Sequence, residues 1–119
     1  MTINSDVGSG LVLPSDPAVP VIDPEPGLRR QVLVHSPSMM LVRHQMRKGW
    51  RGAAHRHPHE QMVYVLSGRI RIRVENAWCE AVAGDNFIVT SNAEHEAEAL
   101  EDSVVLDVFT PAREDYCMT

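Results

Sequence analysis

The sequence predicts an all-β protein, a sandwich or barrel of short antiparallel strands. Several segments are rich in β-branched and aliphatic residues, turn-forming residues separate them, and no long stretch has the period of an amphipathic helix. Short strands with frequent turn signals are typical of closed or double-sheet β architectures. With 119 residues, the chain is expected to form one domain.

The predicted strands follow one another from Arg29 onward. They are 29–35, 39–46, 61–66, 69–74, 86–90 and 103–109. The clearest is RIRIRV at 69–74, in which strict alternation directs Ile70 and Ile72 to the core and the arginines to water. Turn formers lie between these segments, among them Ser67–Gly68 and Gly84–Asp85.

Two regions do not follow this pattern. The first 27 residues hold five of the eight prolines, so we expect an N-terminal arm at 1–27 and a barrel domain at 28–119, although Val21–Ile22 could form an edge strand on a neighbour. The segment SNAEHEAEALED at 91–102 combines high helix propensity with the alternation of a strand. Local sequence leaves both structures open.

Composition excludes several classes of function. The net charge of −5 argues against a protein that binds nucleic-acid backbones, which needs a basic surface. No apolar run approaches the roughly 20 residues of a membrane span, and the N-terminus lacks the pattern of a signal peptide. Cys79 and Cys117 are isolated thiols without the spacing of a metal or redox motif. We therefore expect a cytoplasmic protein.

The densest group of metal-capable side chains is HRHPHEQ at 55–61. On a strand, His55 and His57 would share one face about 6.6 Å apart. Gln61 lies roughly 13 Å further along a straight strand, so it could reach the same ion only if the chain bends, and Pro58 is suited to produce that bend. Spacing alone fits a solvated polar loop equally well.

Two longer motifs carry a resemblance to a known family. GAAHRHPHEQMVYVLSG at 52–68 resembles the first motif of the cupins, and GDNFIVTSNAEH at 84–95 resembles their second motif, with Thr90 and Asn92 in place of a proline and a glycine. The resemblance implies a cupin double-stranded β-helix, or jelly-roll barrel, of two antiparallel sheets. It favours a strand rather than a helix at 92–101.

The same resemblance implies a metal site in the mouth of the barrel. Its ligands would be His55, His57, Gln61 and His95, and the cofactor would be one divalent transition metal ion (Zn, Ni, Fe, Mn or Cu) whose identity stays open. All four ligands are neutral, so the ion would keep its full charge and attract an anionic molecule. His59 is expected either near solvent or beside the ligands without binding the ion, and His35 and His44 are expected to be half-buried structural residues.

The C-terminal stretch LDVFTPAREDY at 106–116 resembles the ending of small cupins of the pectin-degradation (KdgF) family, which open the ring of unsaturated uronates. The resemblance implies catalytic roles for Asp107, which would move protons, and Arg113, which would hold a substrate carboxylate. We expect Phe109 and Tyr64 to contact the substrate. In the alternative interpretation Phe109 only packs in the core and Arg113 only joins a surface ion pair.

The resulting hypothesis is a metal-binding cupin that isomerises or ring-opens a small anionic molecule such as a sugar acid. A non-catalytic or sensory small-molecule-binding cupin is the main alternative, and an iron dioxygenase is less favoured. The resemblance also implies a homodimer in which the arm or an outer strand crosses to the partner. From charge and hydropathy we expect no nucleic-acid or membrane partner.

Overall fold

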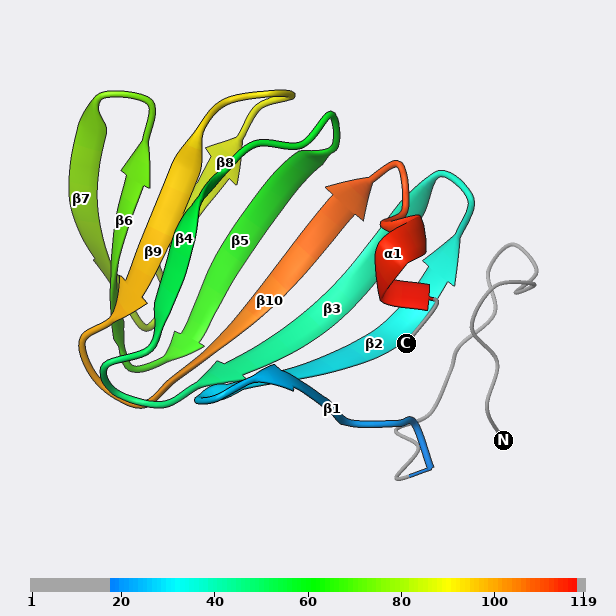
Figure 1. Ribbon diagram of the computed structural model, residues 1–119, viewed down its shortest axis with the longest axis horizontal. Helices are drawn as coiled ribbons and strands as arrows, with labels where there is room; N and C mark the ends of the chain where they lie inside the picture. Colours follow the sequence, from blue (N-terminus) through cyan, green and yellow to red (C-terminus); the bar gives the residue numbers. More distant parts are fainter. Residues whose placement is uncertain (1–17, 118–119) are drawn as a thin grey trace.

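The computed structural model describes residues 18–117, which form two antiparallel sheets packed against each other (Figure 1). The six-stranded sheet contains, in spatial order, β1 (Ile22–Glu25), β2 (Leu28–Ser36), β3 (Met39–Met46), β10 (Ser103–Thr110), β5 (Glu60–Ser67) and β8 (Asn86–Val89). The four-stranded sheet contains β4 (Arg51–His55), β9 (His95–Ala99), β6 (Arg69–Val74) and β7 (Ala77–Val82). A short helix, α1 (Glu114–Cys117), follows β10. The predicted all-β jelly-roll fold is confirmed.

All the strands predicted from alternation are present, with ends that differ by at most one residue. Two further strands, β4 and β7, escaped prediction because most of their side chains are exposed and show no apolar period. The edge strand β1 pairs with β2 of its own chain rather than with a neighbour. Residues 1–17 of the predicted arm lie outside the described residues.

The ambiguous segment 91–102 contains the strand β9, so the strand interpretation is confirmed and the helical one is wrong. β9 lies between β4 and β6 and pairs with both. Its outer glutamates reach arginines of these neighbours, Glu98 to Arg51 and Glu96 to Arg73, while Ala99 is buried. Pairing across the sheet therefore outweighs the local helix propensity.

The main core lies between the two sheets. Val63, Val65 and Val105 contribute from one sheet, and Ile70 and Ile72 from the other. The two isoleucines are each 3% exposed, as the alternation of RIRIRV predicts. Several of these core residues also line the cavity described below, so packing of the core helps to fix the shape of the cavity.

A glycine makes the connection from β5 to β6. Gly68 has a φ of 89°, in the left-handed region, and a Cβ at this position would overlap the Asp102 carbonyl and Ser103. Only glycine fits both conditions. No helix in the described range 18–117 is long and apolar enough to cross a membrane.

Candidate metal centre

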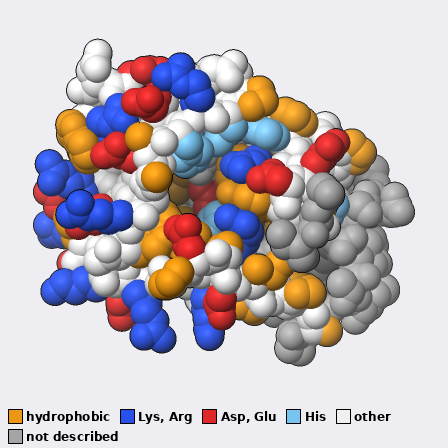
Figure 2. All heavy atoms as spheres, viewed as in Figure 1, with side chains coloured by type: hydrophobic (Ala, Val, Ile, Leu, Met, Phe, Trp, Pro, Cys, Tyr) orange, Lys and Arg blue, Asp and Glu red, His pale blue; other side chains and the backbone are white. Residues whose placement is uncertain are grey.

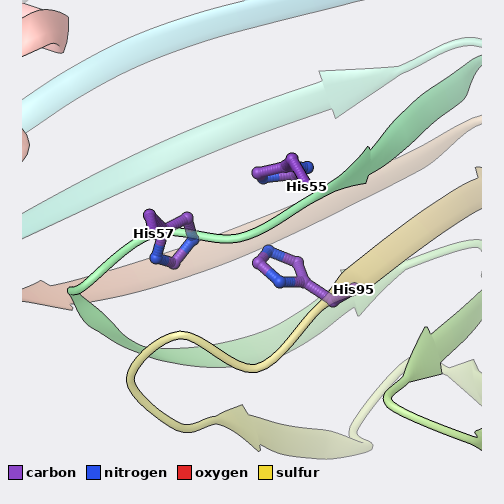
Figure 3. A group of neighbouring side chains, drawn as sticks. All are labelled: His55, His57 and His95. Atoms are coloured by element: carbon purple, nitrogen blue, oxygen red, sulfur yellow. The ribbon is translucent and has the colours of Figure 1, made fainter.

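Three histidines converge at one end of the two sheets (Figure 3). His55 ends β4, His57 follows in the loop to β5, and His95 begins β9, where it pairs with His55 across the sheet. Their possible ligand atoms all lie within 4.8 Å of one another. The sequence motifs therefore bring together three of the four predicted ligands.

Each of these imidazoles is oriented by a backbone carbonyl. The contacts join Nδ1 of His55 to Ala53 O (2.8 Å), Nδ1 of His57 to His59 O (3.0 Å) and Nδ1 of His95 to Ala93 O (2.9 Å). A carbonyl oxygen only accepts, so each neutral ring carries its proton on Nδ1 and leaves Nε2 with a free lone pair. Histidine ligands of metal ions are commonly held in this way.

Gln61, the fourth predicted ligand, is close to His57. Its Oε1 lies 3.1 Å from Nε2 of His57, and its amide nitrogen donates to Oδ1 of Asp107 at 2.7 Å. Because Nε2 of a neutral His57 carries no proton, two acceptor atoms face each other there. A cation would satisfy both lone pairs, so this donor set of three imidazoles and one amide oxygen fits a metal ion.

Burial favours the neutral form of two of the three histidines. Desolvation lowers the pKa of His57, and the charge of Arg113 lowers it further. Desolvation also lowers the pKa of His95, with smaller contributions from the charges of His55 and His57. Neutral imidazole is the form that binds metals, so these rings remain competent ligands at neutral pH.

A backbone hydrogen bond joins the two motifs. The Asn92 N–H donates to the His57 carbonyl at 2.8 Å. Asn92 itself has a φ of 62° and so supplies the left-handed conformation expected of the motif's glycine. Its presence in place of glycine does not prevent His95 from reaching the other histidines.

A cavity of about 440 Å³ opens beside the histidines. Among its lining residues are Gln61, His95, Asp107, Phe109 and Arg113. Figure 2 shows a hollow on this face, with histidines at its edge and both basic and acidic side chains around it. Three of the four predicted ligands, His55, Gln61 and His95, therefore line the same cavity as the predicted catalytic pair.

Asp107 is a buried carboxylate, only 3% exposed. Its Oδ1 accepts from Gln61, and its Oδ2 lies 2.7 Å from Nδ1 of His44. A carboxylate has about four lone-pair positions, so two remain for other partners. Asp107 is thus held firmly and still has acceptor capacity toward the cavity.

Arg113 already binds a carboxylate in the forked geometry predicted for it. Its Nε donates to Oδ1 of Asp115 at 3.0 Å and its Nη2 to Oδ2 at 2.8 Å. Both residues line the cavity, but the Arg113 side chain is only 14% exposed and that of Asp115 is 60% exposed. The hydrogen bonds from Arg113 lower the pKa of Asp115. Arg113 therefore forms an ion pair and also lines the cavity, so each of the two sequence interpretations accounts for part of its position.

The two predicted substrate contacts differ. Phe109 is 1% exposed and packs edge-on against Tyr116, with ring centroids 5.5 Å apart, and it lines the cavity. Tyr64 lies on the outer face of β5, 47% exposed, and is absent from the cavity lining. In β5 the alternation turns Gln61 and Val63 inward, so Tyr64 must point outward. The expectation that Tyr64 contacts substrate is therefore corrected.

Sequence reasoning missed two residues of the site, His44 and Arg30. His44 is 8% exposed rather than half-buried, lines the cavity and contacts Asp107, and Arg30 donates from Nε to His44 Nε2 at 3.1 Å. The sequence did contain a signal for His44. It lies two residues from both Val42 and Met46, so on a strand its side chain points to the same inward face as theirs. His59 is half-buried, with its ring against those of His57 and Phe109.

The two-sheet fold and the clustered histidines define a cupin, and residues 42–109 match the family model for the cupin domain. The chain belongs to the cupin family. Within it, the chain is 32% identical over 92 residues to the pectin degradation protein KdgF of Dickeya dadantii (strain 3937), covering 76% of this chain and 84% of the relative.

Two solved structures are also similar. KdgF from Halomonas sp. has a TM-score of 0.79 and 35% identity, covering 82% of this chain and 92% of that one. An RmlC-like cupin from Shewanella frigidimarina has a TM-score of 0.81 and 33% identity, covering 83% and 89% of the respective chains. Both sequence and structure thus relate the chain to KdgF proteins.

Proposed function

We propose that this protein is a metal-dependent enzyme that isomerises or ring-opens a small sugar acid of the unsaturated uronate type. The observation that carries the proposal is a cluster of three histidines beside a cavity that a buried carboxylate and an arginine also line. The similarity to KdgF proteins, whose name refers to pectin degradation, supports the substrate class.

His55, His57, Gln61 and His95 would hold the ion. When bound, it would act as a Lewis acid that polarises a substrate oxygen. The neutral ligands leave its charge uncompensated, and Arg113 adds a second positive charge beside the cavity. Together these charges favour an anionic ligand over a neutral one.

Arg113 would hold the substrate carboxylate. Its fork is directed at a carboxylate in this structure, that of Asp115, and a uronate offers the same planar pair of oxygens. Most of the Arg113 side chain is buried, 14% exposed, so the substrate would meet a guanidinium of fixed orientation. Binding by this residue would fix the sugar ring relative to Asp107.

Asp107 would move the proton. Ring opening of an unsaturated uronate is an isomerisation, so a proton that leaves a hydroxyl must be balanced by one delivered to carbon. Asp107 lies at the cavity with unused acceptor positions, and a carboxylate in this location suits a general base that later returns the proton. Its hydrogen bonds to Gln61 and His44 would keep it in place during both steps.

An Asp107→Asn variant tests the catalytic role. Turnover of unsaturated uronates should fall by about 10²- to 10⁴-fold, the usual contribution of a general acid or base. Glu60→Gln, which changes an exposed acid next to Gln61, is the matched control and should keep its activity. Full activity of Asp107→Asn would contradict the proton-transfer role. No turnover by the wild type would exclude this substrate class and favour a binding or sensory function.

Metal analysis of a His57→Ala variant tests the ligand assignment. After both proteins are loaded and dialysed, the variant should retain much less transition metal than the wild type, because a site with one fewer imidazole binds more weakly. His35→Ala, which removes a histidine outside the cluster, should retain as much as the wild type. Undiminished metal in His57→Ala would show that the ligands lie elsewhere.

A further inference from the structure

We propose that Arg30 and His44 are positioning residues that determine which atom of the Gln61 amide faces the metal site. They would act through Asp107, and the inference rests on the metal site of the proposed function. Within residues 18–117, Arg30 and His44 are connected to the candidate ligand Gln61 by way of Asp107. Four side chains form one connected row: Arg30, His44, Asp107 and Gln61.

The row crosses four neighbouring strands of one sheet. Its members come from β2, β3, β10 and β5, which are adjacent in that order. Arg30 lies directly opposite His44 in the β2–β3 register. The order of the strands therefore brings the four side chains near one another, and each contacts the next in the row.

The direction of the hydrogen bonds starts at Arg30. A guanidinium has donors and no acceptor, so Nε2 of His44, 3.1 Å from Nε of Arg30, must accept and carries no proton. A neutral His44 then has its proton on Nδ1. Arg30 is itself held in place, because its Cζ lies 3.6 Å from the centre of the Tyr116 ring.

The direction continues through Asp107. His44 donates from Nδ1 to Oδ2 of Asp107 at 2.7 Å, and both side chains are largely buried, 10% and 4% exposed. An ionised carboxylate only accepts, so the Gln61 amide must present its NH₂ group to Oδ1. Its oxygen is thereby turned toward Nε2 of His57.

The reverse orientation of the Gln61 amide is disfavoured at Asp107 in every state and would be disfavoured at His57 once an ion is bound. Its oxygen would face the Asp107 carboxylate as a second acceptor, and its NH₂ group would occupy the place of a metal ligand. A buried acceptor without a donor costs free energy, so the row selects the orientation that offers oxygen to the ion. Outer partners of metal ligands are known to act in this manner.

The first test compares two variants of His44 by Zn²⁺ titration of the metal-free protein. His44→Leu removes the donor to Asp107 and should weaken Zn²⁺ binding at least about tenfold, the lower end of the usual range for outer partners. His44→Asn keeps an N–H near the position of Nδ1 and should remain close to the wild type. Thermal unfolding of both variants checks that they are folded.

The second test needs no variant. Nitrogen NMR of the imidazoles in the metal-free wild type should show His44 protonated on Nδ1 and unprotonated on Nε2. The opposite tautomer would overturn the inference, as would equal Zn²⁺ affinities of folded His44→Leu and His44→Asn. If the wild type binds no Zn²⁺, the proposed metal site fails, and the His44 tautomer decides the hydrogen-bond row by itself. Uronate turnover enters neither test.

Discussion

At the scale of single residues, Arg113 has two competing partners, Asp115 and the proposed substrate. It binds Asp115 through two hydrogen bonds, and it faces the cavity where a substrate carboxylate would lie. Asp115 is largely exposed, so its ion pair is screened by water and weak. A substrate anion would therefore have to displace only a loosely held competitor.

An Asp115→Asn substitution should improve binding of an anionic substrate. Removing the competing charge should lower KM by up to about fivefold, equivalent to the ~1 kcal/mol at most that an exposed ion pair contributes. Steady-state kinetics with an unsaturated uronate would measure this. Glu114→Gln, which neutralises the neighbouring exposed acid, is the control and should leave KM unchanged. A KM that does not fall in Asp115→Asn would speak against Arg113 as the carboxylate ligand.

Proximity of the candidate ligands was predictable where a motif fixes both residue type and spacing. His55, His57 and His95 lie together and Gln61 lies beside His57, while their role as ligands stays a prediction. His44 was missed because its importance depends on β3 lying next to β10, a pairing between residues more than sixty positions apart. Parity showed that His44 points inward, but only the sheet order shows that Asp107 is its neighbour.

At the scale of elements, the turn before β9 depends on Asn92. Its φ of 62° costs little for asparagine or glycine and much more for a β-branched residue. Asn92→Gly should therefore leave folding and Zn²⁺ affinity near the wild type. Asn92→Val should lower the free energy of unfolding by about 1–2 kcal/mol and weaken Zn²⁺ binding, because His95 follows the turn.

Chemical denaturation and Zn²⁺ titration of the two variants would test this. If Asn92→Val were as stable as Asn92→Gly and bound Zn²⁺ equally well, the turn would not be what positions His95. The pair is matched, since both variants remove the same amide side chain and differ in the backbone conformation they permit.

Element-level prediction worked for strands with one buried face. β6 shows the clean alternation that burial on one side produces, whereas β7 buries only Ala81 among its residues and gives no such signal. For β9, local composition pointed to helix and alternation to strand. The pairing with β4 and β6, which no local pattern contains, decided the outcome.

At the scale of the whole molecule, the outer face of the six-stranded sheet exposes an apolar row. Met62, Tyr64 and Leu66 of β5 and Ile88 of β8 are each more than 40% exposed, and Met62 pairs with Ile88 across the strands. Such a row suits contact with another protein surface. We expect the protein to be a homodimer that uses this face.

A Met62→Glu/Ile88→Glu double variant should be monomeric, because two like charges would be buried against their copies in the partner. Light scattering after size exclusion would give the mass of each protein. Val82→Glu, which places a charge at an exposed apolar position of β7 in the other sheet, should remain dimeric. A monomeric wild type would contradict the dimer, and a dimeric double variant would place the interface elsewhere.

The order of strands within the sheets was predictable only where a family motif specifies it. Alternation and turns alone give a β sandwich or barrel without telling which strands are neighbours. The two cupin motifs supply that order for the strands around the site. Tyr64 lies three residues after Gln61 on β5, so its side chain points to the opposite face of the strand. Strand geometry alone therefore predicts that Tyr64 points away from the cavity, although an aromatic residue is a common substrate contact.

The backbone hydrogen bond from Asn92 to His57 has a consequence for redesign of the site. It ties together the two loops that carry the candidate ligands without using any of their side chains. Substitutions can therefore exchange one metal-binding side chain for another while the joint persists. The proposed ligand set should therefore be open to redesign one side chain at a time on an unchanged backbone.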